Sequence, residues 1–235
     1  MGTLATAQEI VDRSTNELGL AHSELISGAI TQIGIQALAL MNSLGEDLVR
    51  AHDWQFLEKT ATFVGDGFST SFPLPSDFGR IVNQTAWSIG QRQPMDGPTS
   101  PQMWGWLKMG LVSGDILFRY RILADRLEIF PTPGAGEQIQ FYYISKRWVL
   151  AVSGGYADTV INSADKPLFD RSLMIKGVKA RLWAQKGFDT SVLAREYNDA
   201  LQAIKAQDQG MPTIYLSGRR DFHLIDGQNV PDGSW

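Results

Sequence analysis

The chain of 235 residues contains no cysteine, which excludes disulfide bonds, thiolate metal sites and cysteine nucleophiles. Its three histidines, His22, His52 and His223, lie far apart, and none has a second ligand at the spacing of a metal site. No apolar run is long enough to cross a bilayer. Patterns for a nucleophile elbow, a phosphate-binding loop or a dinucleotide-binding loop are also absent. We therefore expect no enzyme and no catalytic, cofactor-binding or metal-binding residues.

Basic residues are not concentrated anywhere in the chain, whose formal net charge is -4. Residues 1–60 are acidic, with eight aspartates and glutamates against three arginines and lysines. Without a basic patch, tight binding to nucleic acid phosphates is not expected. The carboxylates Glu46, Asp47, Asp125 and Glu128 are interpreted as solvated charge, and a two-carboxylate glycosidase is the weaker reading.

Residues 24–53 carry the strongest pattern in the chain. Apolar or small side chains recur at the spacing of one helix face, at Ile26, Ile30, Ile33, Ala37, Leu40, Leu44, Leu48 and Ala51. A second stripe, formed by Ile35, Leu38 and Met41, widens the apolar arc. Two interpretations stay open: the helix is buried in its own domain, or it is shared with a neighbouring subunit. A shorter helix should precede it, because Thr6 and Glu9 form a capping box and Gly19 is placed to end it.

The pattern changes to strands after Trp54. Residues 60–64 and 68–74 flank Gly65-Asp66-Gly67 and predict a hairpin, and residues 79–89 predict another strand. Residues 116–122, 126–130 and 138–144 alternate apolar and polar side chains and predict a meander with one wet face. We expect this six-strand block to form a small sandwich or half-barrel, with Arg119, Arg121 and Arg126 on the solvated face. Ser100-Pro101 predicts the start of a short helix between the strands.

Two further helices are expected after a polar loop at residues 153–166. The first begins at Pro167 or Asp170 and ends before Gly187, and Asp189 caps the second. The apolar face of the second helix is predicted to hold Val192, Leu193, Tyr197, Ala200, Leu201 and Ile204.

Residues 211–235 are rich in proline and glycine, which excludes a long helix, yet they are too apolar for a solvated linker. This tail either docks on a partner or folds back on the β-domain. The predicted class is α+β: a helical core from N- and C-terminal helices, an inserted antiparallel β-domain and an extended C-terminal tail. The predicted units are residues 1–58 and 151–209 for the core, 59–150 for the β-domain and 210–235 for the tail.

Several segments together resemble one protein family. They are His52-Asp53-Trp54-Gln55, the tract from Phe72 to Arg80 that ends in Leu-Pro-Ser-Asp-Phe-Gly-Arg, the segments 97–104 and 143–148, and the end Val230-Pro231-Asp232-Gly233-Ser234-Trp235. In this order, and with the α-β-α layout, they resemble the head-to-tail adaptor (head-completion, tail accessory) proteins of tailed bacteriophages.

The resemblance implies a structural virion protein, assembled in the host cytoplasm, that works by binding. Such adaptors form a ring, usually a dodecamer, beneath the portal protein, and a tail tube or nozzle protein attaches on the other side. Genomic DNA passes through the lumen without sequence-specific binding, and no membrane is involved. The acidic N-terminal segment would suit such a lumen.

The resemblance also assigns roles to residues. The portal-docking tail would use Ile214, Tyr215, Leu216, Arg219, Phe222, Leu224, Val230 and Trp235. The ring interface would use Ile30, Ile33, Ala37, Leu40, Leu44, Leu48, Tyr197 and Leu201. Two rivals remain: a carbohydrate-binding or minor tail component that stacks sugars on Trp87, Trp104 and Trp106, and a tail-associated cell-wall hydrolase.

Overall fold

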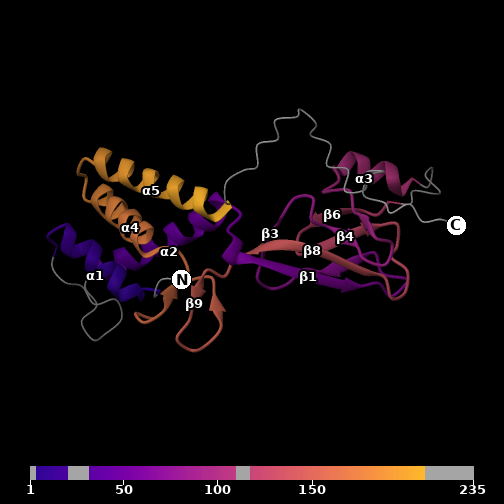
Figure 1. Cartoon of the computed structure of the whole chain (residues 1–235), viewed down its shortest axis with the longest axis horizontal. Coiled ribbons are helices and arrows are strands. Elements are labelled where there is room, and N and C mark those ends of the chain that lie inside the picture. The colour runs from indigo at the N-terminus through magenta and orange to yellow at the C-terminus, as the bar shows by residue number, and fades with distance from the viewer. Residues whose placement is uncertain (1–3, 21–31, 110–116, 210–235) are drawn as a thin grey trace, which may run out of the picture.

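The computed structural model describes residues 4–20, 32–109 and 117–209. Along its longest axis the molecule has a helical part and a β part, which meet near the end of α2 (Figure 1). The helices of the described ranges are α1 (Ala7–Glu17), α2 (Gln32–Ala51), the 3₁₀ helix η1 (Gln55–Leu57), α3 (Pro101–Lys108), α4 (Arg171–Gln185) and α5 (Ser191–Gln209). The strands are β1 (Glu58–Val64), β2 (Ser71–Pro73), β3 (Phe78–Ile81), β4 (Trp87–Ser88), β5 (Gln93–Pro94), β6 (Arg119–Leu123), β7 (Arg126–Phe130), β8 (Gln138–Ser145), β9 (Val149–Leu150), β10 (Tyr156–Ala157) and β11 (Lys166–Pro167).

The predicted helix starts that lie among the described residues are confirmed by capping hydrogen bonds, whereas the predicted start of the central helix near residue 24 lies outside them. Thr6 Oγ1 accepts from the backbone N–H of Glu9 at 3.2 Å, and the Glu9 carboxylate accepts from the N–H of Thr6 at 3.3 Å. The side chains of Ser100, Asp170 and Asp189 likewise accept from backbone N–H groups at the starts of α3, α4 and α5. Local sequence thus determines where these helices begin.

In the helical part, α4 packs against α1, α2 and α5. Gly177 of α4 permits a close approach, because a Cβ there would lie 2.5 Å from Leu44 Cδ2 of α2 and 3.1 Å from Tyr197 Cε2 of α5. Gly45 of α2 similarly accommodates the buried indole of Trp148, which a Cβ at this position would overlap. Two glycines therefore set the spacing inside the larger hydrophobic cluster of the chain.

One face of α2 is buried within the chain itself. Its buried residues are Gly34, Ala37, Met41, Leu44, Gly45, Leu48 and Val49. Ile35 is 57% exposed, and Ile33, Leu38 and Leu40 are half-buried. The apolar arc of α2 is thus wider than the face that the chain covers.

The β part is a sandwich of two antiparallel sheets around a second hydrophobic cluster. The first sheet has the order β1-β8-β4-β5, with β3 also paired to β8, and the second has the order β2-β7-β6. The rings of Phe63 on β1 and Phe72 on β2 lie 5.7 Å apart between the sheets. The buried residues that the sheets share are Ala61, Ile139, Phe141 and Tyr143 from the first and Phe72, Tyr120, Leu127 and Ile129 from the second.

The predicted hairpin between residues 60–64 and 68–74 is wrong. β1 pairs with β8, and β2 pairs with β7 in the other sheet. The Asp66 carboxylate accepts from the backbone N–H groups of Phe68 and Ser69, and the N–H of Gly65 bonds to the carbonyl of Glu137. The turn therefore leads the chain from one sheet to the other. Its residues specify a turn, but packing between distant segments selects the strand partners.

Other strand predictions are confirmed only in part. β6 and β7 form the expected antiparallel pair, but residues 131–136 lead to β8 in the opposite sheet, so the meander does not continue. The predicted strand 79–89 is divided into β3 and β4, and Gln84 between them adopts a φ of 60°. Within the predicted loop 90–99, β5 pairs with β4. Backbone irregularities of this kind leave no clear trace in side-chain alternation.

A third sheet, with the order β10-β9-β11, lies beside the helices, where the sequence predicts mainly a polar loop. The buried Asp165 carboxylate accepts from three backbone N–H groups of this segment. Burial alone would raise the pKa of Asp165, but these hydrogen bonds lower it. Asn42 of α2 exchanges two hydrogen bonds with the backbone of Val160. Polar side chains therefore hold this segment together with its buried apolar residues Val149 and Val160.

The chain enters the β part on β1 and leaves it on β8, and these two strands are paired, with Glu58 opposite Ile144. The predicted α+β class is confirmed, with helices from both ends of the described chain forming one cluster. The predicted C-terminal tail at residues 210–235 lies outside the described residues.

Candidate functional site

Residues 74–80, which carry the strongest part of the resemblance, lie where the β part meets the helices. Asp77 is 7% exposed and accepts hydrogen bonds from Lys59 Nζ at 2.6 Å, Tyr143 Oη at 2.9 Å and Ser145 Oγ at 3.0 Å. Burial alone would raise the pKa of Asp77, but the three hydrogen bonds outweigh it and lower the pKa to about 2. Burial and the bond to Asp77 raise the pKa of Tyr143 to about 12. An ionised carboxylate thus connects β1, β8 and the turn before β3.

Arg80, three residues later, connects β3 to the end of α2. Its guanidinium donates to Asp53 Oδ1 at 2.8 Å, to the carbonyl of Val49 at 2.6 Å and to the carbonyl of His52. The last carbonyls of a helix lack partners within the helix, and a cation there complements the helix dipole. Gly79 allows the close packing, because a Cβ there would lie 2.7 Å from a backbone oxygen of β8. The sequence pattern identifies these residues as distinctive, but it does not reveal this joining role.

His52 also contributes to this junction. Its Nε2 lies 3.3 Å from Asp208 Oδ2 near the end of α5, and its ring meets Trp54 edge to face at 4.8 Å. The end of α2 is therefore in contact with the end of α5 as well as with the β part.

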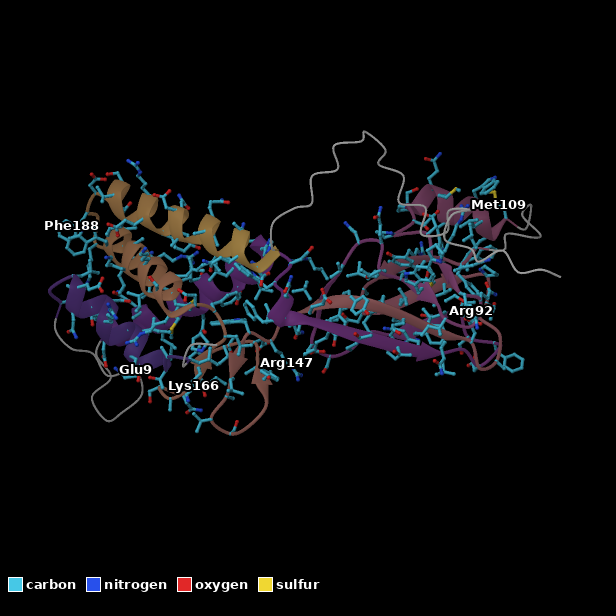
Figure 2. All side chains as sticks on the ribbon, viewed as in Figure 1. Glu9, Arg92, Met109, Arg147, Lys166 and Phe188 are labelled. Carbon is cyan, nitrogen blue, oxygen red and sulfur yellow. The ribbon has the colours of Figure 1, made fainter. Side chains whose placement is uncertain are left out.

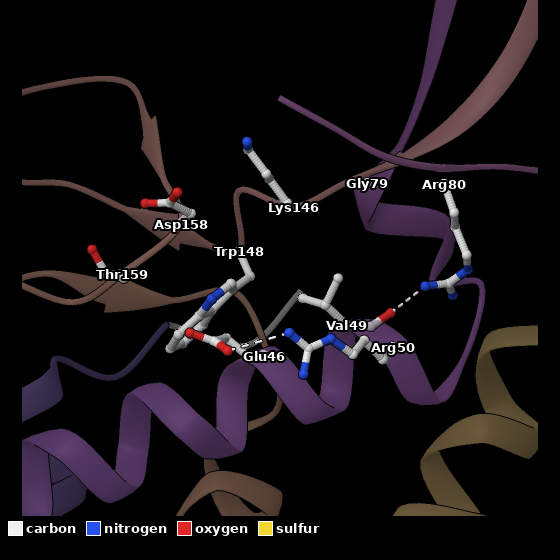
Figure 3. A pocket seen from close by; sticks show the side chains of 9 residues that line it. All are labelled: Glu46, Val49, Arg50, Gly79, Arg80, Lys146, Trp148, Asp158 and Thr159. Carbon is white, nitrogen blue, oxygen red and sulfur yellow. Dashed lines mark hydrogen bonds and ion pairs between the residues drawn. The ribbon is translucent and has the colours of Figure 1, made fainter. Parts of the chain in front are cut away.

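A pocket of about 390 Å³ opens at the junction (Figure 3). The buried indole of Trp148 forms one wall, and its Nε1 has no hydrogen-bond partner among the described residues. Charges of both signs surround the opening, which does not fit a purely anionic ligand. The residues that line it are Glu46, Val49, Arg50, Gly79, Arg80, Lys146, Trp148, Asp158 and Thr159.

The residues predicted for a ring interface fall into three groups. Ala37, Leu44 and Leu48 are fully buried in the chain's own core. Ile33, Leu40, Tyr197 and Leu201 are half-buried and keep part of their apolar surface free, and Ile30 lies outside the described residues. A side chain without exposed surface makes no direct contact with another subunit unless the core changes. Surface for an interface is therefore left mainly on the half-buried group.

α5 lies on the outside of the helical part, and none of its described residues is fully buried. Tyr197, Ala200, Leu201 and Ile204 pack with half-buried side chains on the core cluster, and burial raises the pKa of Tyr197. Val192 is 67% exposed, so its predicted place on the inner face is wrong. It stands five positions before Tyr197, which places it on another side of the helix.

The tryptophans of the rival carbohydrate hypothesis do not form one platform. Trp104 is 3% exposed, and the Arg121 guanidinium carbon lies 4.7 Å from the centroid of its ring. Trp106, in contrast, is 44% exposed. Trp87 lies on β4 of the first sheet, whereas Trp104 and Trp106 lie on α3. The predicted arginine face is partly neutralised, because Arg121 pairs with Glu128 at 2.6 Å.

The residues predicted for portal docking, from Ile214 to Trp235, lie outside the described residues. Among the residues that the structure does describe, no group of three or more histidines, aspartates or glutamates is placed to hold a metal ion. None of the helices in this part of the chain combines the length and the hydropathy of a membrane span.

The comparisons with known proteins give one family. A family model described as SU10 adaptor protein matches residues 5–220. The match spans the helical part, the β part and the junction between them. No curated protein matches the chain.

Proposed function

The chain belongs to the SU10 adaptor protein family, an adaptor family of phage head-tail proteins, and on that premise we propose that its copies form a ring beneath the portal. The ring would extend the DNA channel and provide the attachment site for the tail. In this proposal the protein acts by binding, without catalysis. Its partners are the portal protein, a tail tube or nozzle protein and further copies of itself, twelve in a complete ring.

The incomplete burial of α2 and α5 is the observation that supports the proposed ring. α5 has no fully buried residue among those described, and α2 leaves Ile35 57% exposed. Apolar helix surface that the chain itself does not cover is typical of subunit interfaces. We assign the interface to Ile33, Leu40, Tyr197 and Leu201, with Ala37, Leu44 and Leu48 as the core that supports them. Ile30 belongs to the same proposal.

We assign different contacts to the helical part, the β part and the C-terminal tail. Residues 1–58 and 151–209 would form the ring, and residues 59–150 would face outward or toward the next tail component. The tail at residues 210–235 would dock on the portal through Tyr215, Phe222, Leu224 and Trp235, because aromatic anchors are common in such interfaces. Ile214, Leu216, Arg219 and Val230 would complete the contact.

Native mass spectrometry of the chain mixed with the portal ring of its phage tests this proposal. The full-length chain is expected to add many copies to the portal, and a chain that ends at Gly210 few or none. Equal addition by both would keep the adaptor role but move the portal contact to the helices. If neither chain is added, portal binding is refuted.

A further inference from the structure

Phe68 is an unusually exposed aromatic residue. It lies in the turn between β1 and β2, and it is 90% exposed, the highest value among the large hydrophobic residues that the structure describes. Single exposed hydrophobic residues are common and need no explanation by themselves. Phe68 differs from other exposed hydrophobic residues because it lies in a turn that hydrogen bonds hold in place.

The Phe68 turn is held by its own polar groups. Asp66 Oδ1 accepts from the N–H of Phe68 at 2.9 Å and from the N–H of Ser69 at 2.6 Å, and Asp66 Oδ2 accepts from Ser69 Oγ at 2.5 Å. Gly65 packs against Pro133 in the adjacent turn. These bonds hold the backbone that carries Phe68, which lowers the entropy cost of inserting its side chain into a partner.

The outer face of the first sheet carries a pocket with aromatic and aliphatic walls, which suits a phenyl ring. We name it the Trp87 pocket; it has a volume of about 420 Å³, more than one phenyl ring requires. Its apolar walls come from Trp87, Ile89, which is 41% exposed, and Tyr142, which is 37% exposed. Arg92 stands at its edge, and its guanidinium has no partner among the described residues.

The two features are complementary in shape and charge. A phenyl ring suits the aromatic and aliphatic walls, and the carboxylate of Asp66, two residues from Phe68, would face the cation of Arg92. Phe68 does not occupy the pocket of its own chain, since it is 90% exposed. A Phe68 ring in this pocket would therefore come from another molecule, and a second copy supplies both halves of the contact.

Their positions also suit a closed ring. β1 ends at Val64 opposite Gln138 of β8, and Trp87 pairs with Gln140, two residues further along β8. The Phe68 turn and the Trp87 pocket therefore lie at nearly the same level, at the end of the β part away from the helices, where Figure 2 places Arg92. A head-to-tail contact, with its two halves on different surfaces of one copy, closes into a ring when the rotation between successive copies closes.

We propose that Phe68 of each copy inserts into the Trp87 pocket of its neighbour, so that the β part, as well as the helices, closes the ring. This contact rests on the proposed ring. It would give each copy a second ring interface, in the β part, in addition to the proposed helical one.

Cysteine cross-linking tests the contact directly, because the natural chain has no cysteine. A chain that carries both Phe68→Cys and Ile89→Cys is expected to form a ladder of covalent oligomers with a short bis-maleimide. The single variants Phe68→Cys and Ile89→Cys should give no ladder. Native mass spectrometry of the same samples reports whether rings are present.

A second variant measures the strength of the contact. Phe68→Ala is expected to raise the protein concentration needed for half-maximal ring assembly at least tenfold, with an unchanged melting temperature. Leu123→Ala, at a residue 55% exposed in the other sheet, is the matched control and should change neither value.

The outcomes separate the two proposals. Rings that form without a ladder, and with Phe68→Ala assembling as readily as the natural chain, overturn the contact and leave the ring in place. If Phe68→Ala rings form normally but no longer bind the next tail component, the contact is also overturned, because the turn then binds that component. If no rings form with the natural chain, the proposed function itself fails and the contact fails with it.

Discussion

Asp77 and Arg80 stand three positions apart and form opposite ends of one connection. Asp77 collects three hydrogen bonds inside the β part, and Arg80 reaches out to the end of α2. A buried charge is costly unless its partners are all present, so Asp77, which is 7% exposed, is not easily replaced alone. We therefore attribute the distinctive sequence at residues 74–80 to the junction rather than to a ligand.

Asp77→Asn tests this attribution, because it keeps the shape of the side chain and removes its charge. We expect the free energy of unfolding at pH 7 to fall by about 2 kcal/mol, since Lys59 loses its counter-charge. The folded pKa of about 2 lies below the value of 3.8 for a free aspartate, so this stabilisation is present above about pH 4 and is lost as the pH falls toward 2. The difference between the two proteins should therefore shrink across that range.

Urea denaturation at pH 7, 5 and 3 measures this difference. Asp199→Asn, at a side chain 76% exposed on α5, is the control and should change stability by less than about 0.5 kcal/mol. A difference for Asp77→Asn that stays constant with pH would show that the charge of Asp77 is not what stabilises the junction.

At the scale of elements, close helix packing depends on glycine at a few positions. Gly177→Ala is expected to lower the free energy of unfolding by about 1–3 kcal/mol, because its Cβ would lie 2.5 Å from Leu44 Cδ2. Gly105→Ala in α3 is the matched control: nothing lies within 4 Å of its Cβ, so helix propensity should raise stability by about 0.5–1 kcal/mol. Chemical denaturation of the two variants gives both values. Equal effects would mean that α2 and α4 do not constrain each other at Gly177.

The elements also show what the sequence is able to predict. Helix starts depend on residues within four positions, and the caps at Thr6, Ser100 and Asp170 are confirmed. Strand partners depend on contacts between distant residues, so Gly65-Asp66-Gly67 was sufficient to predict a turn but not the pairing of β1 with β8. The junction was missed for the same reason, since Asp77 and Lys59 are 18 residues apart.

At the scale of the whole molecule, the chain leaves part of the apolar arc of α2 uncovered, with Ile35 57% exposed. Ile35→Glu is expected to weaken ring assembly at least tenfold without lowering the melting temperature, because the new charge is solvated in the monomer and would be buried in the proposed interface. Sedimentation velocity over a concentration series measures the assembly. Val152→Glu, at a residue 62% exposed in the segment after β9, should assemble normally. Equal assembly of both variants would place Ile35 outside the interface.

The pairing of β1 with β8 has a further consequence for how the molecule changes over time. Because Glu58 stands opposite Ile144, the two ends of the inserted segment are already neighbours. A short turn would therefore be enough to close the chain without this segment, and a segment of another size would join the same two ends. In the proposed adaptor, where the β part faces the next tail component, a change of that component would then require replacement of only one continuous stretch of the coding sequence.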